Sequence, residues 1–290
     1  MRYSLLHAFT CSLIALLCSC SGRSGPGSSQ PPAHLQDYFN AEWAMDQHWD
    51  DGLAEVALYE AERVIYKKPR QFEYAQITVK EDFNREHNVK TDDYTRRDLY
   101  PVMKVNQFAR IPTDNYPYHF LSSLFFRREN PVEVFKMTIG SQEWCGNTFK
   151  SFQKEGGSYS LAYNSYWDGQ GIGELTVDGE VLFEDQLPYT LRSLRFADNL
   201  RFEAPIAEYQ QTNKANRPQV YQARLAVDQE TLTAGESPAK AWRVVVQLGP
   251  EKTNTYWFSQ TMPHVLLRQR TWDGRSLDLK SLERYAYWQN

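Results

Sequence analysis

Cys145 is the residue of this chain whose possible chemistry is easiest to name, because a thiolate is a nucleophile. It stands between Trp144 and Gly146 in the segment Glu143-Trp144-Cys145-Gly146-Asn147. A catalytic thiol needs a nearby base, and no protease-type signature surrounds this one. Three histidines can supply the base only if the fold brings them there: His87, His119 and His264. The alternative is that Cys145 is a small buried hydrophobe beside Trp144 at a strand end.

Other motifs that carry chemistry are missing from the sequence. It contains no His-Glu-x-x-His or Cys-x-x-Cys spacing, so we expect no metal. The glycines between Gly169 and Gly173 precede a strand pattern, whereas a dinucleotide site needs a helix there, so we expect no cofactor. The lack of these motifs favours a protein that is not an enzyme. The alternative is a hydrolase that uses Cys145 or a carboxylate. The candidate site region is Glu143, Trp144, Cys145, His119 and His264.

Composition narrows the class of protein. The formal net charge of -4 argues against a nucleic-acid partner, which usually requires a basic excess. The mean hydropathy of -0.63 excludes a multi-span helical membrane protein. Hydrophobic residues make up 41% of the chain, enough for a packed core, and aromatic residues make up 14%, which favours strands.

The N-terminus contains an apolar run from Leu5 to Leu17 that has the length of a signal-peptide core. It ends in Leu17-Cys18-Ser19-Cys20, which resembles the bacterial lipoprotein signal, with Leu three residues before the modified cysteine. By this resemblance, residues 1–19 are a signal peptide and Cys20 carries the lipid. Residues 20–33 are small, polar and rich in Pro and Gly, and we expect a flexible tether. An ordinary secretory peptide and an uncleaved anchor are the alternatives.

The lipid anchor predicts a cell-envelope location. No acidic residue follows Cys20 directly, which favours the outer membrane with the protein facing the periplasm. Processing and lipidation leave Cys145 as the lone thiol of the mature chain, so no internal disulfide is possible. We therefore expect residues 34–290 to form a single domain stabilised by its core.

Alternation with a period of two residues dominates the mature chain. It is clear in residues 72–83, 131–139, 219–228 and 240–249. Asp178-Gly179 and Asp273-Gly274 are typical of two-residue hairpin turns. Short helices are expected in residues 34–49 and 187–201, and residues 210–218 form a polar loop and a possible boundary. The fold class is mainly β (β-rich α+β), a curved antiparallel sheet or half-barrel with one or two short helices.

Several segments resemble a family of uncharacterised lipoproteins that is common in Bacteroidetes. The segment that contains Glu-Trp-Cys-Gly is the most specific of them. The resembling segments are DGLAEV from Asp51, VKEDF from Val79, YPYHFLSSLFF from Tyr116, SQEWCGNTF from Ser141, Tyr163 to Tyr166, and Pro263 to Leu279. Some members are labelled septum formation inhibitor, a label that implies nucleotide chemistry, but this sequence contains no nucleotide-handling motif.

These observations predict a membrane-anchored envelope lipoprotein that binds an apolar ligand or a protein partner. The sheet would present an aromatic-lined concavity, partly covered by the helix near residues 187–201. The alternatives are the hydrolase named above and a structural subunit of an outer-membrane complex. The expected partners are thus the membrane, through the lipid, and an apolar ligand or envelope protein, without nucleic acid.

Overall fold

The alternating segments form strands of one large sheet. The computed structural model describes residues 34–234 and 237–289, so the predicted signal peptide, Cys20 and the tether lie outside the described residues. In the described part there are sixteen strands. They are β1 (Ala54–Ile65), β2 (Lys68–Asn84), β3 (Val89–Lys90), β4 (Leu99–Ile111), β5 (Tyr118–Arg127), β6 (Val134–Glu143), β7 (Gly146–Glu155), β8 (Ser158–Ser165), β9 (Ile172–Asp178), β10 (Leu182–Phe183), β11 (Leu200–Ala207), β12 (Val220–Ala234), β13 (Ser237–Gly249), β14 (Lys252–Ser259), β15 (Leu266–Arg270) and β16 (Ser276–Tyr285).

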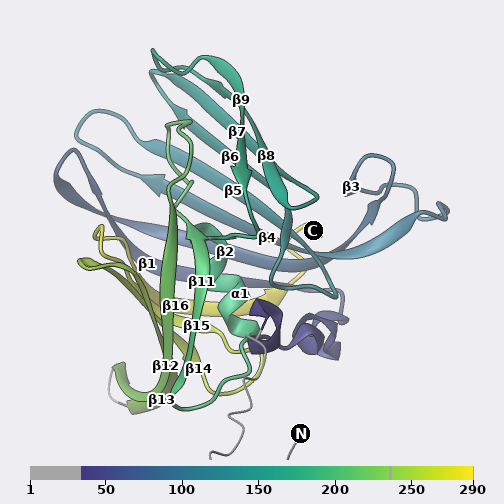
Figure 1. Ribbon diagram of the computed structural model, residues 1–290, viewed down its shortest axis with the longest axis vertical. Coiled ribbons are helices and arrows are strands. Elements are labelled where there is room, and N and C mark those ends of the chain that lie inside the picture. Colours follow the sequence, from purple (N-terminus) through teal and green to yellow (C-terminus); the bar gives the residue numbers. More distant parts are fainter. Residues whose placement is uncertain (1–33, 235–236, 290) are drawn as a thin grey trace, which may run out of the picture. The chain divides into compact units, whose positions relative to one another are not determined.

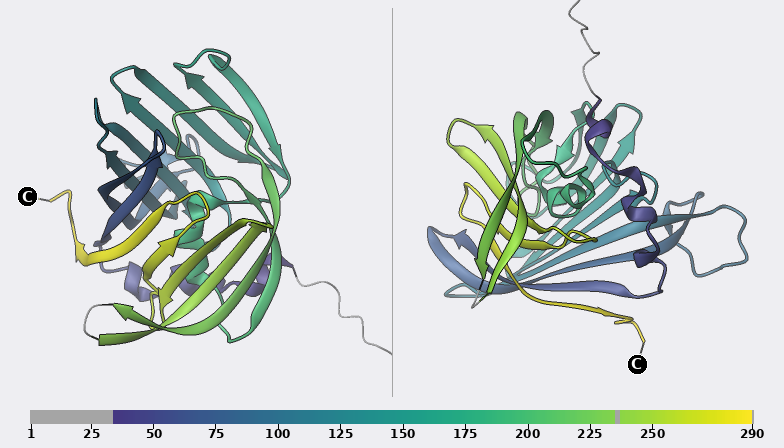
Figure 2. Two further views of the ribbon diagram at one scale, coloured as in Figure 1. Left: turned by 90° about the vertical axis from the view of Figure 1, so that its left-hand side faces the viewer. Right: turned by 90° about the horizontal axis from the view of Figure 1, so that it is seen from below.

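The sheet is antiparallel almost throughout and strongly curved, as Figures 1 and 2 show. Strands that follow one another in sequence are mostly neighbours in the sheet, and β1 pairs with β16, which joins the two ends of the domain. The edge strands β9 and β10 are consecutive in sequence, so the chain passes from one edge to the other through residues 179–181. The predicted curved antiparallel sheet is confirmed.

Alternation along each strand separates an inner, buried face from an outer face. In β4, Val105, Gln107 and Ala109 are buried, whereas Phe108 and Arg110 are exposed. Apolar side chains of the inner face form two main clusters. One extends over β1, β2, β4, β5 and β11–β16 and includes Val244 and Phe258, and the other lies largely on β4–β8 and includes Leu124 and Phe152. Because burial follows a period of two, the pattern in the sequence located β2, β6, β12 and β13, which overlap the four predicted segments.

The two predicted helices are much shorter than expected. Residues 35–49 form three separate 3₁₀ turns, Leu35–Tyr38, Ala41–Met45 and Gln47–Trp49, instead of one amphipathic helix. In the second segment, the α-helix α1 covers only Leu187–Thr190 between two further 3₁₀ turns, and β11 begins at Leu200. Both segments are buried against the inner face through Trp43, Trp49 and Tyr189. Tertiary packing of these large side chains therefore replaces regular helical hydrogen bonding.

One predicted hairpin is present and one is absent. Asp273-Gly274 lies between the paired strands β15 and β16, but the connection has five residues, 271–275. Asp178-Gly179 does not close a hairpin, because β9 pairs with β8 and β10 pairs in parallel with β11. Gly179 does adopt a positive φ of 90°, so the predicted turn at Asp178-Gly179 is confirmed. The prediction that the strands on its two sides pair with each other is wrong.

The predicted polar loop is an irregular segment that we call the strap (residues 208–219). It is not a domain boundary, because His34–Asn290 form one unit and the strap is bound to the inner face. Arg63 of β1, Ser122 of β5 and Lys150 of β7 each hydrogen-bond to it. Gln210 and Gln211 are consequently buried. Within residues 34–234 and 237–289, no helix has the length and apolar character that a membrane crossing needs.

Candidate functional site

The predicted nucleophile Cys145 lies at the tip of the β6–β7 hairpin and is exposed. The interpretation that it is a buried small hydrophobe is therefore wrong. The neighbouring Trp144 is 80% exposed and stacks on the ring of Tyr116, with centroids 5.8 Å apart. The Tyr116 hydroxyl and the Cys145 Sγ are 2.8 Å apart. A phenol that is hydrogen-bonded to the thiol is a poor substitute for the imidazole that acts as the base of a cysteine nucleophile.

The other predicted site residues are only partly brought together. Glu143 points to the inner face, where its Oε1 accepts a hydrogen bond from Asn213 Nδ2 at 2.8 Å. His119 pairs with Gln142 across β5 and β6, close to the hairpin but on the outer face. His264 lies elsewhere, with its Nδ1 3.0 Å from the Ser259 carbonyl oxygen and its ring against Phe196. In the described part of the chain, no histidine hydrogen-bonds to Cys145.

An apolar groove on the outer face lies near His119. Its floor is a row of cross-strand partners, Phe108, Leu121, Gly140 and Phe149, on β4, β5, β6 and β7. The three large side chains of this row are 39%, 39% and 50% exposed. We call this hollow, with a volume of about 440 Å³, the outer groove. Gly140 gives the groove its depth, because a Cβ built there would have only one atom within contact range, the Leu121 oxygen at 4.0 Å.

One side of the outer groove is polar. His119, Gln142 and Asn147 line it and form the next cross-strand row toward the hairpin tips. Arg110, opposite His119 on β4, extends this row and is exposed. Among the described residues, Arg110 has no hydrogen-bonded or ion-paired partner. The groove thus combines an apolar floor of the size range of small-molecule sites with a permanent positive charge at its side.

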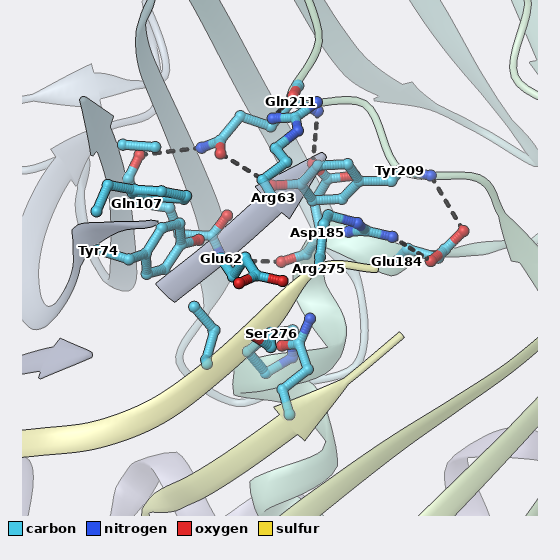
Figure 3. Close-up of a pocket in the computed structure, with 15 residues that line it drawn as sticks. Glu62, Arg63, Tyr74, Gln107, Glu184, Asp185, Tyr209, Gln211, Arg275 and Ser276 are labelled. Atoms are coloured by element: carbon cyan, nitrogen blue, oxygen red, sulfur yellow. Dashed lines mark hydrogen bonds and ion pairs between the residues drawn. The ribbon is translucent and has the colours of Figure 1, made fainter. Parts of the chain in front are cut away.

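A second hollow, the interior cavity, lies on the inner face beneath the strap (Figure 3). Residues of β1, β2, β4, β15 and β16 line it together with residues 184–188 and the strap. The space is small, about 30 Å³, which is room for one or two water molecules. Its wall carries charged and amide groups beside the rings of Phe72, Tyr74 and Tyr209, so this part of the inner face is more polar than the aromatic-lined concavity that the sequence predicted. The labelled residues in Figure 3 are Glu62, Arg63, Tyr74, Gln107, Glu184, Asp185, Tyr209, Gln211, Arg275 and Ser276.

Asp185 hydrogen-bonds to the strap above this cavity. Its two carboxylate oxygens accept hydrogen bonds from the backbone N–H groups of Gln210 and Gln211, at 2.8 and 2.9 Å. Its own carbonyl oxygen accepts one from Gln107 Nε2 at 2.8 Å. Burial raises the pKa of Asp185 to about 6, although the hydrogen bond from Gln210 acts in the opposite direction. The carboxylate is therefore held in its charged form at neutral pH against a desolvation cost.

Tyr209 and two arginines close the cavity beside Asp185. The Arg275 guanidinium lies 3.6 Å from the Tyr209 ring centroid, and that of Arg63 lies 5.5 Å from it. Arg275 also donates to Glu184 at 3.0 Å, and Glu184 accepts from Asn254 at 2.8 Å. These contacts connect the cavity wall to β14 and to the β15–β16 loop.

Lys150 holds the strap from β7 and is fully buried. Its ammonium group donates to the carbonyl oxygens of Gln210 and Lys214, at 2.5 and 2.8 Å. Burial lowers the pKa of Lys150 to about 8, with the Asp185 carboxylate opposing this shift. Two buried groups of opposite charge therefore bind the same irregular segment.

The residues of the interior cavity are not among those predicted from the sequence. A usable signal was the acidic pair Glu184-Asp185, because it interrupts an apolar run from Val181 to Leu191. Charged side chains in such a run are buried only when they are paired. The arginines and glutamines gave no signal, because they come from segments spread between residues 63 and 275 and only the folded sheet brings them together.

Comparisons with known proteins give little further information. No family model matches the chain, and no curated protein matches it. One solved structure, described as a beta-barrel-like protein of a domain of unknown function, DUF1849, from Brucella abortus, has a TM-score of 0.49 and 11% identity. That match covers 81% of this chain and 98% of the other. The fold itself defines the class: a mainly β protein built on one curved antiparallel sheet. Among the described residues, no group of three or more His, Cys, Asp or Glu side chains is arranged to hold a metal.

Proposed function

We propose that this protein is a lipid-anchored binding protein of the bacterial cell envelope, and that its outer groove holds an anionic amphiphile. One observation carries the proposal: the apolar row Phe108–Leu121–Gly140–Phe149 lies directly beside a polar row whose arginine, Arg110, has no partner in the described part of the chain. An acyl chain would lie on the apolar row, and its acidic group would face Arg110 and His119.

The size and chemistry of the groove favour an amphiphile over a polar solute. Three large apolar side chains are left in water, and covering them is favourable in proportion to the area removed from solvent. Each methylene of a buried chain contributes about 0.8 kcal/mol, so affinity rises with chain length. A carboxylate or phosphate head group gains a charge-assisted hydrogen bond from Arg110.

The test is fatty-acid binding by a chain that begins at Ser21, which keeps every described residue. Calorimetric titration with dodecanoate is expected to show saturable binding that weakens in Arg110→Ala. The variant Gly140→Leu fills the groove and is expected to abolish binding. Its matched control is Gly157→Leu, where a side chain at the β7–β8 turn has no neighbour within 4 Å. Equal binding by both leucine variants would show that the groove is not the site.

The anchor requires a separate measurement. Cys20 is expected to incorporate labelled palmitate, and Cys20→Ala is expected to release the protein from membranes. Unchanged maturation and partitioning of that variant would remove the envelope assignment without affecting the groove. A structural subunit of an outer-membrane complex would instead co-purify with a stable protein partner in the absence of added ligand. The version of the hydrolase alternative that uses Cys145 receives no support from the surroundings of that residue.

A further inference from the structure

We propose that His48 and Arg284 form an acid-sensitive latch, which fastens the C-terminal end of β16 to the turn before β1 and opens when His48 is protonated. The proposal is independent of the outer groove, whose lining residues lie on β4–β7. It rests on a hydrogen bond that only a neutral imidazole can accept.

The latch lies where the two ends of the domain meet. Strands β1 and β16 pair along what we call the seam, and the last pair of the seam is Ala54 with Tyr285. Arg284 precedes Tyr285 on β16. The 3₁₀ turn Gln47–Trp49 comes shortly before β1, and His48 is its central residue. A contact between His48 and Arg284 therefore joins the beginning of the domain to its end.

The hydrogen bond between these two side chains fixes the protonation state of His48. Arg284 Nη1 lies 2.9 Å from His48 Nε2. A guanidinium group has N–H donors and no acceptor, so Nε2 must accept this bond. The imidazole is therefore neutral and carries its proton on Nδ1. When the imidazole is protonated, both ring nitrogens carry a hydrogen, so the bond is lost and two positive charges face each other.

Arg284 also binds the backbone of the turn and the residue that follows it. Its Nη2 donates to the carbonyl oxygen of His48 at 2.8 Å. Its Nε and Nη2 donate to the two carboxylate oxygens of Asp51, at 3.0 and 2.6 Å. The His48 ring packs edge-on against Trp49, with the ring centroids 4.7 Å apart. Movement of the ring away from the guanidinium therefore disturbs the turn that carries it.

Three carboxylates and a second guanidinium group surround His48. Asp51 is paired with the latch, and the side chain of Asp46 accepts a hydrogen bond from the His48 backbone N–H at 2.8 Å. Glu55 is bound on both carboxylate oxygens by Arg192, from the segment after α1. The positive charges of the two arginines thus offset the attraction of these carboxylates for an imidazolium.

The surroundings favour the neutral form of His48. Burial lowers its pKa below the ordinary value of 6.5, Arg284 and Arg192 act in the same direction, and Glu55 and Asp51 oppose them. Opening releases the ring into water, so the open form binds a proton more readily than the closed form. Between pH 6.5 and the lowered pKa, the population of the open form therefore rises by up to about tenfold for each unit by which the pH falls. Well above pH 6.5, His48 contributes nothing to the pH dependence of opening.

The experiment is amide hydrogen exchange of the chain that begins at Ser21, measured by NMR between pH 7.5 and pH 5. Rates are divided by those of an unstructured peptide at the same pH, because exchange itself depends on pH. Protection of the Trp49 and Asp50 amides, which are bonded within the turn, and of the last seam pair is expected to fall below pH 6.5. Leu124 on β5 reports the response of the whole domain, and the fall at the latch should exceed it. Unchanged protection at the latch would show that protonation only turns the ring, and would overturn the proposal.

Three variants identify the group that responds to acid. His48→Gln keeps an oxygen that can accept from Arg284 but cannot be protonated, so the acid response should disappear. Arg284→Met removes the positive charge, and the midpoint of His48 in an NMR titration should rise toward 6.5. His87→Gln, at an exposed position in the turn between β2 and β3, is the matched control and should respond as the wild type does. An acid response that survives in His48→Gln would assign the effect to another group and contradict the latch.

Discussion

Arg192 and Glu55 form a two-pronged ion pair that is almost wholly buried in the domain. The Nη1–Oε1 and Nη2–Oε2 distances are 2.6 and 2.9 Å, and the residues are 1% and 2% exposed. The pair joins the segment after α1 to β1, and the guanidinium lies against the rings of Trp43 and Trp49, 5.2 and 5.5 Å from their centroids. It fixes the position of the irregular segments that fill the inner face, where regular helices were expected.

Removing one member of this pair is expected to destabilise the domain strongly. Arg192→Met leaves the Glu55 carboxylate buried without its partner, and the expected loss is about 3–5 kcal/mol of unfolding free energy. Urea unfolding followed by tryptophan fluorescence measures it. The control is Arg224→Met, which breaks an exposed pair with Glu203 and should change stability by less than about 1 kcal/mol. Equal effects of the two variants would show that burial does not matter here.

The raised pKa of Asp185 predicts that this residue contributes more to the stability of the domain in mild acid than at neutral pH. Burial raises its pKa from 3.8 to about 6, so between these values the folded chain binds more protons than the unfolded chain. The contribution of Asp185 to stability therefore increases as pH falls through 6, and it is lost again as pH rises. Between pH 7.5 and pH 5, wild type should gain about 1 kcal/mol relative to Asp185→Asn. Histidine titration contributes equally to both proteins and therefore cancels in this comparison. If the unfolding free energies of the two proteins changed in parallel with pH, the raised pKa of Asp185 would be excluded.

The lowered pKa of Lys150 predicts that its contribution to the stability of the domain changes at alkaline pH. Burial lowers its pKa from 10.5 to about 8, so between these values the unfolded chain binds more protons. The stability contributed by this group therefore rises with pH across that window. Between pH 7 and pH 9.5, wild type should gain about 2 kcal/mol relative to Lys150→Met. An NMR titration of the Lys150 side chain gives a second reading, and an ordinary lysine midpoint would contradict the prediction.

Cys145 is expected to be accessible but not essential. In a chain that begins at Ser21 it is the lone cysteine, so labelling reports on it directly. A maleimide should modify the folded protein completely, because the thiol is exposed at the hairpin tip. Tyr116→Phe removes the hydroxyl that contacts Sγ and should change the labelling rate without unfolding the chain. Cys145→Ala should bind dodecanoate as the wild type does, and loss of a hydrolytic activity in that variant would instead revive the enzyme hypothesis.

The strands were predictable because their signal is local. A sheet with one face in water imposes a period of two on the sequence, and residues 72–83 and 240–249 show it clearly. Hairpin pairing was less predictable. Asp178-Gly179 has the local chemistry of a tight turn, but whether the flanking strands pair depends on the whole sheet, and here the turn joins its two edges.

The sites depended still more on long-range structure. The polar sequence of the strap is typical of a surface loop, yet Gln210 and Gln211 are buried because Asp185 and Lys150 satisfy their backbone groups. Likewise, Phe108, Leu121 and Phe149 are unremarkable as single outward-facing residues, and only the strand register aligns them into a groove.

The sequence by itself therefore determined the fold class, the positions of most long strands, and the features that predict export and lipidation. Only the tertiary structure decided that Cys145 is exposed beside Tyr116, that His264 lies apart from it, and that charged groups surround a cavity beneath the strap. The physical reason is that alternation and turn chemistry act between neighbours in the chain. A binding site, in contrast, is made by strands whose proximity is set by the curvature and register of the complete sheet.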